Sequence, residues 1–281
     1  MRFFAPALQT AVQARAAMED EIRSALRQSQ FLLYYQPQVD TAGLIGVEAL
    51  LRWQHPVRGL LPPGQFIRLA EESGLIVPLG DWVLEEACRQ IDLWSQTHPS
   101  SSIPISVNIS ARQFRQPDFV EQVLGVLRRT NANPACLDLE LTESMLLDNI
   151  EDAIAKMNEL KQHGVRFSLD DFGTGYSSLN YLKRLPFDQL KIDRSFVHDL
   201  LDDVGSQAIA RSIISLGSAL GLNVIAEGVE NSAQRDLLID LGCNSFQGHF
   251  YSHPLALADF ESRWRPSDGV QQSTAALNNP G

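Results

Sequence analysis

The sequence predicts an α/β fold, and within that class a closed barrel of the (β/α)8 type. Short apolar segments alternate with helical patterns along most of the 281 residues, which is typical of parallel strands joined by helices. About 250 residues take part in this alternation, the usual length of such a barrel. The apolar segments also end repeatedly on a carboxylate, an amide or a lysine, as strands do when they deliver polar groups to one mouth of a barrel.

The beginning of the chain is expected to form a helix followed by an antiparallel pair of strands. Residues 1–17 are expected to be a tail or the remnant of a linker. A stripe of apolar residues then predicts a helix over Met18–Gln28. The strand-like segments Phe31–Val39 and Leu44–Leu51 are separated by a short turn that contains Gly43, so we expect them to pair as a hairpin.

Strands and helices are expected to alternate after the hairpin. The helices, predicted from the spacing of apolar residues, are Pro63–Ser73, Asp81–Thr97, Pro117–Thr130, Glu143–His163, Ser177–Arg184, Gln207–Ala219, Ser232–Leu241 and Ala256–Trp264. Asp81 is a suitable N-cap, and Gly164 and Gly221 are suitable residues to end a helix.

Two segments are expected to lack a fixed structure. Phe172–Leu179 is rich in glycine and serine, which predicts a mobile loop over the mouth that excludes water when it closes. Residues 266–281 are rich in Gln, Ser, Asn, Gly and Pro, which predicts a disordered tail. The domain itself is therefore expected to cover residues 18–265.

Composition excludes several classes of protein. A net charge of -11 argues against binding of a nucleic-acid polymer, which requires a basic surface that releases counterions. The three cysteines are odd in number and far apart, which indicates a reduced, cytoplasmic protein without a disulfide framework. No apolar run is long enough to cross a bilayer, so this segment is expected to make no membrane contact.

The candidate site consists of the polar residues at the ends of the apolar segments. If the predicted register is right, five carboxylates meet there beside an asparagine, a lysine and a glutamine. They are Glu48, Glu140, Asp170, Asp171 and Glu227, with Asn108, Lys191 and Gln247. Side chains alternate between the faces of a strand, so Glu140 points away from Leu139 and Leu141.

So many carboxylates repel one another strongly. Two of them about 5 Å apart cost roughly 3 kcal/mol at an effective dielectric constant near 20. Either some carboxylates hold protons, or divalent cations bind among them. Oxygen donors suit Mg²⁺, Mn²⁺ or Ca²⁺ better than Zn²⁺, and adjacent Asp170 and Asp171 could serve two ions.

Each residue alone also has a structural explanation. Asp170-Asp171 could form a turn and a helix N-cap, and Glu227 could be a solvated strand end. Asn108 could cap a turn, and Lys191 could be an exposed lysine on a strand edge. The metal site is favoured because several strands would otherwise have to end on such residues for unrelated reasons.

The same residues lie in motifs that resemble those of EAL domains, the phosphodiesterases that degrade cyclic di-GMP. The resemblance covers about residues 20–263 in ordered blocks, which is far more specific than the three-residue motif Glu48-Ala49-Leu50 alone. The blocks include Tyr35-Gln36-Pro37, Glu48-Ala49-Leu50, Val107-Asn108-Ile109-Ser110, Glu140-Leu141-Thr142-Glu143, Asp170–Leu179, Lys191-Ile192-Asp193, Glu227-Gly228-Val229-Glu230 and Gln247-Gly248.

The resemblance implies a modified TIM barrel with an antiparallel first strand, and a role for each site residue. The metal ligands would be Glu48, Asn108, Glu140, Asp170, Asp171 and Glu227, binding two Mg²⁺ or Mn²⁺ ions, with Ca²⁺ as an inhibitor. Catalysis would involve Glu48, Asp171, Lys191 and Glu227. Cyclic di-GMP would contact Gln36, Arg52, Gln247 and Pro254. Glu143 would anchor the loop that starts at Phe172, and Glu230 would support the site.

Hydrolysis of cyclic di-GMP to linear pGpG is the expected function, with a homodimer and an upstream GGDEF or sensory domain as implied partners. A non-catalytic cyclic di-GMP receptor is the alternative within the family. Outside it, Lys191 could be the Schiff-base nucleophile of an aldolase-like barrel, although neighbouring carboxylates should raise its pKa. One departure from the family pattern is that His249, Phe250 and His253 replace a tyrosine, a hydrophobic residue and a lysine.

Overall fold

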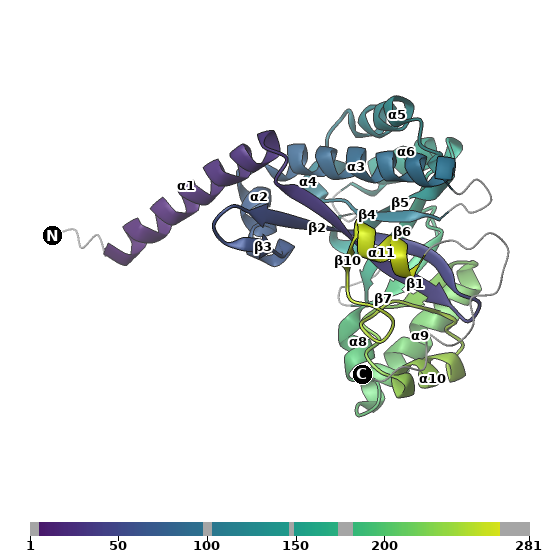
Figure 1. The fold of residues 1–281 in the computed structure, drawn as a ribbon. Coiled ribbons are helices and arrows are strands. Elements are labelled where there is room, and N and C mark those ends of the chain that lie inside the picture. Colours follow the sequence, from purple (N-terminus) through teal and green to yellow (C-terminus); the bar gives the residue numbers. More distant parts are fainter. Residues whose placement is uncertain (1–5, 98–102, 146–148, 174–181, 265–281) are drawn as a thin grey trace.

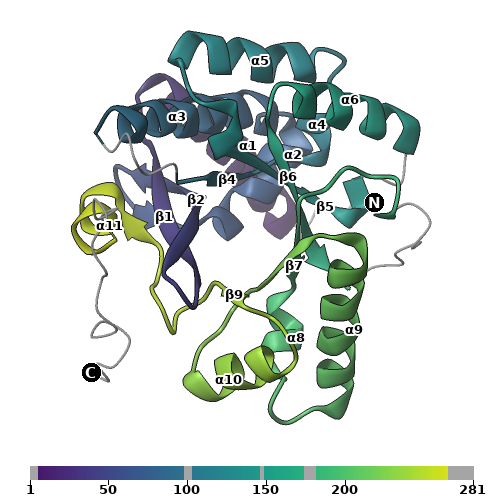
Figure 2. The same cartoon turned by 90° about the vertical axis from the view of Figure 1, so that its right-hand side faces the viewer.

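The computed structural model describes residues 6–97, 103–145, 149–173 and 182–264, with side chains from residue 13 onward. Within this part of the chain, eight strands close into a barrel with helices on its outside (Figures 1 and 2). The barrel strands are β1 (Phe31–Asp40), β2 (Leu44–His55), β4 (Ile105–Asn108), β5 (Leu137–Thr142), β6 (Arg166–Phe172), β7 (Gln189–Ile192), β8 (Asn223–Ala226) and β9 (Ser245–Phe246).

The first strand runs against its neighbours, as predicted. β1 pairs antiparallel with β2 on one side and with β9 on the other, which closes the barrel. All pairings from β2 through β4 to β9 are parallel. Two short strands, β3 (Gly59–Leu61) and β10 (Leu255–Ala256), pair with β2 and β1. The hairpin predicted from the sequence is therefore confirmed, and the fold is a modified (β/α)8 barrel.

Helices cover the outside of the barrel and connect its strands. They are α2 (Ile67–Ser73), α3 (Ile76–Thr97), α4 (Ala111–Phe114), α5 (Phe119–Thr130), α6 (Ile150–Gln162), α8 (Arg194–His198), α9 (Val204–Leu220), α10 (Ser232–Asp240) and α11 (Leu257–Arg263). Short 3₁₀ turns occupy Pro63–Gln65, Pro134–Cys136 and Glu143–Met145. Gly164 and Gly221 follow α6 and α9 with positive φ, as expected of residues that end a helix.

Several predicted helix boundaries are wrong. Asp81 is not an N-cap, because α3 already begins at Ile76; Pro78 lies in the first turn, where a proline is tolerated. The helix predicted over Glu143–His163 is a 3₁₀ turn followed by α6, whose N-cap Asn149 accepts a hydrogen bond from the Asp152 amide. Most of the predicted helix Ser177–Arg184, of the predicted loop Phe172–Leu179 and the whole predicted tail 266–281 lie outside the described residues.

The N-terminal helix α1 (Pro6–Arg27) begins earlier than the predicted Met18. Its C-terminal half packs on the body through Ile22 and Ala25, which are both fully buried, and it contacts α2. Residues 13–17 are exposed, and Figure 1 shows the first half of the helix projecting away from the barrel. The helix therefore combines a docked half with a projecting half.

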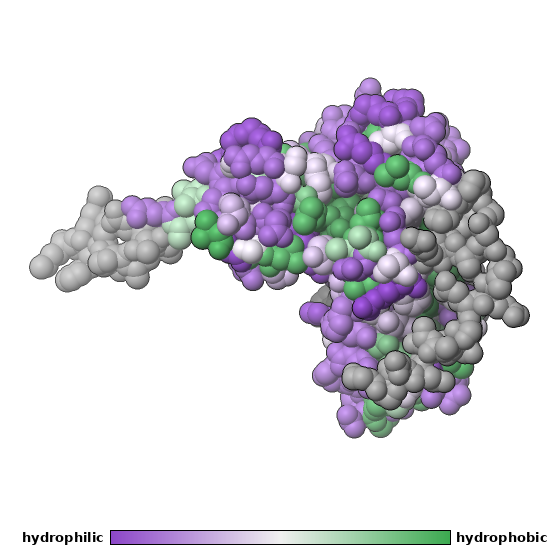
Figure 3. Space-filling view, viewed as in Figure 1, coloured by the Kyte–Doolittle hydropathy of each residue, from purple (hydrophilic) through white to green (hydrophobic). Residues whose placement is uncertain are grey.

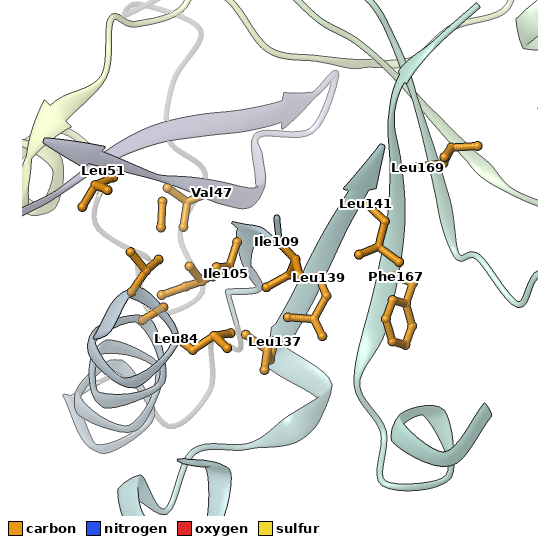
Figure 4. Close-up of a cluster of buried hydrophobic side chains, with 14 of the residues drawn as sticks. Val47, Leu51, Leu84, Ile105, Ile109, Leu137, Leu139, Leu141, Phe167 and Leu169 are labelled. Carbon is orange, nitrogen blue, oxygen red and sulfur yellow. The ribbon is translucent and has the colours of Figure 1, made fainter. Parts of the chain in front are cut away.

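The core lies between the barrel strands and the helices around them. Leu139 and Leu141 of β5 are fully buried and face this layer together with Ile105 and Phe167 from the neighbouring strands (Figure 4). Glu140, between the two leucines, is also buried, but it must point to the opposite face because strand side chains alternate. Packing of the apolar face thus fixes the direction in which the polar residues point.

The surface in Figure 3 is mostly hydrophilic, with a smaller hydrophobic area near the centre of that face. Among the described helices, none is both long enough and apolar enough to span a bilayer.

Candidate active site

The carboxyl ends of the strands bring the predicted site residues together inside the barrel. Paired strands place Asn108 beside Glu140, and Lys191 lies on the next strand but one. Gln36 of β1 is directly opposite Glu48 of β2. The parallel register places Glu48, Asn108, Glu140 and Lys191 at one edge, where the ends of parallel strands meet, and the antiparallel β1–β2 pairing adds Gln36.

The ammonium group of Lys191 is the centre of the site. Its Nζ atom lies 2.5 Å from Glu227 Oε1, 2.8 Å from Glu140 Oε1, 3.5 Å from Asp170 Oδ1 and 3.6 Å from Glu48 Oε2. Lys191 is only 1% exposed, which rules out an exposed lysine on a strand edge. Four carboxylates against one ammonium leave a net charge of -3 if all are ionised.

Burial and the close approach of these charges shift the pKa values of the groups. Burial alone lowers the pKa of Lys191, but the surrounding carboxylates, Glu140 first, outweigh it and raise that pKa well above its usual value. Burial, and then the charge of Glu48, raises the pKa of Glu140 well above its usual range. Burial raises the pKa of Glu227 to about 8 although Lys191 opposes the shift. The high pKa of Lys191 disfavours the Schiff-base alternative, which needs a neutral amine.

Glu48 is held by amide groups on both of its oxygens. Asn108 Nδ2 donates to Oε1 at 2.6 Å, and Gln247 Nε2 donates to Oε2. Burial acts to raise the pKa of Glu48, but Lys191 and these two donors together lower it. The surroundings of Glu48 therefore favour its ionised form.

A cavity of about 510 Å³ opens above this cluster. Gln36, Glu48, Asp170, Glu227, Glu230 and Gln247 line it, as do Arg194, Ser195 and His198 from α8 and Asp199 directly after that helix. The volume lies in the range of small-molecule sites. Six residues predicted from the sequence therefore share one cavity.

Asp171 lies at the rim, on the exposed side of the strand end. Its φ of 54° is in the left-handed region, which aspartate tolerates better than most residues. Burial, then the charge of Asp170 and a hydrogen bond with Asp193, raise the pKa of Asp171 to about 6. Asp170 turns inward and Asp171 outward, so the two neighbours face different surroundings.

The structure does not bring every predicted residue into the cavity. Arg52 donates to the carbonyl of Leu51 at 2.9 Å and lies over the Tyr34 ring, 5.4 Å from its centroid. Pro254 follows Ser252 and His253 and is outside the lining. Both carboxylate oxygens of Glu143 are buried without a hydrogen-bond partner, and the loop that it was predicted to anchor falls largely on residues 174–181, outside the described residues.

Sequence reasoning missed two polar residues next to the site. Gln38 is 4% exposed and donates to Gln247 Oε1 at 3.1 Å; its position two residues after Gln36 on a strand was the available signal. Asp193 contacts Asp171, and its own side chain caps α8 by accepting from the Ser195 amide at 3.0 Å.

The donor chemistry of the cluster fits a divalent cation, although the arrangement does not yet resemble a metal centre. Among the described residues, no group of three or more His, Cys, Asp or Glu side chains is placed to hold a metal ion, since Lys191 lies between the carboxylates. Both carboxylate oxygens of Glu140 and Oδ1 of Asp170 are nevertheless buried without a hydrogen bond, because the approach of Nζ is close but poorly directed. Carboxylate oxygens are the ligands that Mg²⁺ and Mn²⁺ prefer, and these atoms are not committed to hydrogen bonds.

Comparison with known proteins identifies the family. The sequence pattern of the EAL domain matches residues 19–254, so this chain belongs to the EAL domain family. It is 46% identical over 255 residues to the bifunctional diguanylate cyclase/cyclic di-GMP phosphodiesterase MucR of Pseudomonas aeruginosa, covering 90% of this chain and 37% of that protein. It is 41% identical over 262 residues to the cyclic di-GMP phosphodiesterase PdeR of Escherichia coli, covering 93% of this chain and 39% of that protein.

Solved structures agree with this assignment. A c-di-GMP complex of the PaMucR phosphodiesterase has a TM-score of 0.84 and 46% identity, covering 87% of this chain and 99% of that one. The EAL domain of FimX from P. aeruginosa shares the fold at 23% identity, with a TM-score of 0.77, covering 85% of this chain and 96% of that one. The chain spans well under half the length of the two curated relatives, so it corresponds to one part of those proteins.

Proposed function

We propose that this chain hydrolyses one phosphodiester bond of cyclic di-GMP to give linear pGpG, with divalent metal ions. The observation that carries the proposal is the group of four carboxylates around Lys191 at the base of a cavity. Every position that the family resemblance assigned to metal binding is filled by a carboxylate or an amide. The relatives named as cyclic di-GMP phosphodiesterases support the choice of substrate.

The residues that would hold two Mg²⁺ or Mn²⁺ ions are Glu48, Asn108, Glu140, Asp170, Asp171 and Glu227. When bound, such ions polarise a phosphate oxygen and lower the pKa of water, which makes hydrolysis possible at neutral pH. A cation would also offset the negative charge that one ammonium leaves uncompensated.

Lys191 and Asp171 would have opposite roles toward the proton. Lys191 stays protonated because its pKa is raised, so it donates hydrogen bonds from Nζ and orients the attacking water or a phosphate oxygen. Asp171, with a pKa of about 6, is mostly ionised at neutral pH and can accept a proton from that water. Asp171 is therefore the better candidate for the base.

The cavity walls would bind the rest of the dinucleotide. Gln36 and Gln247 present amides beside Glu48, and Arg52 could pair with a phosphate if it leaves the Leu51 carbonyl, since guanidinium geometry suits phosphate. Pro254 is proposed to contact the substrate from the rim, and Glu230 to support the site.

The proposal is tested by incubating the purified chain with cyclic di-GMP and Mn²⁺, with and without EDTA, and separating the products by chromatography. We expect pGpG in Mn²⁺, none in EDTA, and a loss of about 100-fold or more in Glu48→Gln. Tight binding of cyclic di-GMP without pGpG over hours would make the chain a receptor instead. Equal turnover in Glu48→Gln would refute the assigned site.

We also infer that the chain acts as a homodimer and is joined to an upstream domain of the GGDEF or sensory type. Support for the upstream domain comes from the MucR relative, whose name includes a diguanylate cyclase activity and which is much longer than this chain. The oligomeric state is measured directly by light scattering with and without cyclic di-GMP, and a monomer under both conditions would contradict the first part.

A further inference from the structure

Gln38 belongs to a buried chain of amides that ends on Glu48. Gln36 Nε2 donates to the carbonyl of Ser252 at 3.0 Å, and Gln36 Oε1 accepts from Gln247 Nε2 at 3.1 Å. Gln247 Nε2 also donates to Glu48, while Gln247 Oε1 accepts from Gln38 Nε2 at 3.1 Å. The three glutamines are 4–7% exposed, so these contacts are shielded from solvent.

The orientation of each side-chain amide in this hydrogen-bond network matters because the oxygen and the NH₂ group of an amide have nearly the same shape. Both hydrogens of Gln247 Nε2 are used, one on Gln36 and one on Glu48. If the amide turned over, its carbonyl oxygen would face the Glu48 carboxylate. The Glu48 carboxylate, which can only accept, and the Gln38 donor on the other side of the amide therefore both favour the orientation in which Gln247 donates to Glu48.

The position of Gln38 is itself fixed by a glycine. Gln38 is opposite Gly46 in the β1–β2 pairing, and a Cβ atom on Gly46 would lie 2.8 Å from Gln38 Oε1. Only glycine leaves this space without moving the end of the glutamine. Gly46 and Gln38 thus form a pair across the hairpin, next to the Gln36–Glu48 pair.

We propose that Gln38 is a positioning residue of the site: it orients the Gln247 amide, which in turn orients the Glu48 carboxylate toward a bound divalent cation. This inference rests on the proposed function for its kinetic consequences, but its effect on cation binding is independent of turnover. Partners of metal ligands commonly change metal affinity or activity by about 10- to 100-fold when they are removed.

The test uses Gln38→Met, which keeps the length of the side chain and removes the donor, with Gln113→Met as the matched control. Gln113 is 1% exposed, donates to Asp81 Oδ1 at 3.3 Å and also lies over a glycine, Gly80, but it is outside the cavity. Each variant is measured for Mn²⁺ affinity by calorimetry without substrate, for kcat and KM with cyclic di-GMP, and for its unfolding midpoint.

We expect Gln38→Met to weaken Mn²⁺ binding and lower kcat, each by about tenfold or more, with a smaller change in KM. Gln113→Met should retain both at the wild-type level, whatever its unfolding midpoint. Gln38→Glu should have the larger effect, because a carboxylate accepts and would turn the Gln247 amide. Gly46→Ala, which displaces Gln38 without altering it, should act in the same direction and serves if Gln38→Met does not fold.

Wild-type Mn²⁺ affinity in Gln38→Met and Gly46→Ala would overturn the inference, as would equal losses in Gln38→Met and Gln113→Met. Failure of the proposed function looks different: the wild type binds Mn²⁺ without producing pGpG, and the ratio of Mn²⁺ affinities still decides the role of Gln38.

Discussion

Lys191 is the residue on which the charge balance of the site depends. It is the cation inside a ring of four carboxylates, and it is almost completely buried. A buried charge without its partner costs several kcal/mol, far more than an exposed one. The state of this ammonium therefore affects stability, cation binding and catalysis together.

Replacing Lys191 with methionine should expose the repulsion between the carboxylates. In EDTA we expect Lys191→Met to lose about 3–5 kcal/mol of unfolding free energy at pH 8, measured by urea denaturation. The loss should be smaller at pH 5, where protonation relieves the repulsion, and smaller in Mn²⁺, which supplies positive charge. Lys183→Met, on a side chain outside the cavity lining, is the control. A loss that is the same at both pH values and in Mn²⁺ would contradict this account.

Asp138 is another buried acid, located on β5 two residues before Glu140. Burial raises its pKa even though Ser168 donates to Oδ2 at 2.7 Å, and its Oδ1 has no hydrogen-bond partner. A raised pKa means that the folded state holds the proton more tightly. The stability from this group is complete below the unfolded-state pKa, near 4, and is lost as pH rises through the folded-state pKa.

Asp138→Asn should therefore be more stable than the wild type at pH 8 and not at pH 4. The measurement is urea denaturation in EDTA at both pH values. Asp202→Asn, which changes an exposed aspartate, should match the wild type throughout. An Asp138→Asn variant that is less stable at pH 8 would show that the carboxylate contributes favourable contacts.

At the residue scale, the sequence predicted the polar strand ends well. Glu48, Glu140, Asp170 and Lys191 could be found because each interrupts an apolar segment whose outer face is fixed by packing. Gln38 shares a strand face with Gln36, but its role was missed because its contact with Gln247 joins residues 209 apart in the chain. Arg52 and Pro254 were predicted from resemblance alone, and their roles depend on a ligand.

At the scale of the elements, the strand ends are held by close backbone contacts. Gly248, directly after β9, would place a Cβ atom 2.1 Å from the carbonyl oxygen of Val229 and 2.3 Å from its amide nitrogen. Neither backbone atom can move without shifting the segment that follows Glu227. Glycine at this position is therefore a condition for bringing Gln247 and Glu227 to the same mouth.

Gly248→Ala should destabilise the fold by about 1–3 kcal/mol or more and reduce turnover of cyclic di-GMP. Gly64→Ala is the control, since nothing lies within 4 Å of the added atom and its φ is not positive. Thermal unfolding and turnover of both variants test this. A Gly248→Ala protein that matches Gly64→Ala in stability would contradict the packing described here.

Elements that pack on the core were predicted more accurately than helix ends, which make few contacts with the core. The hairpin followed from alternation and a turn, and β1 and β2 were found. The start of α3 was missed because Asp81 was interpreted as the N-cap, whereas the helix begins at Ile76 and accepts Pro78 in its first turn. The start of α1 was missed because the residues before Met18 carry no apolar stripe, so no packing signal marks them.

At the scale of the whole molecule, α1 extends from the barrel (Figure 1). Deleting residues 1–17 should leave the unfolding midpoint unchanged, because residues 13–17 are exposed. Deleting through Gln28 removes Ile22 and Ala25, which are fully buried, and should lower it. The two truncations are compared by calorimetry. A large loss on removal of residues 1–17 would place the domain boundary earlier than residue 18.

The central claim is that the carboxylates around Lys191 bind divalent cations. Anomalous diffraction from crystals grown with Mn²⁺ and cyclic di-GMP tests it most directly. We predict anomalous peaks between Glu48, Asn108, Glu140 and Asp170, with Lys191 Nζ moved away from at least one carboxylate that it now contacts. A map without such peaks, in which Lys191 keeps all four contacts and turnover persists, would contradict the account.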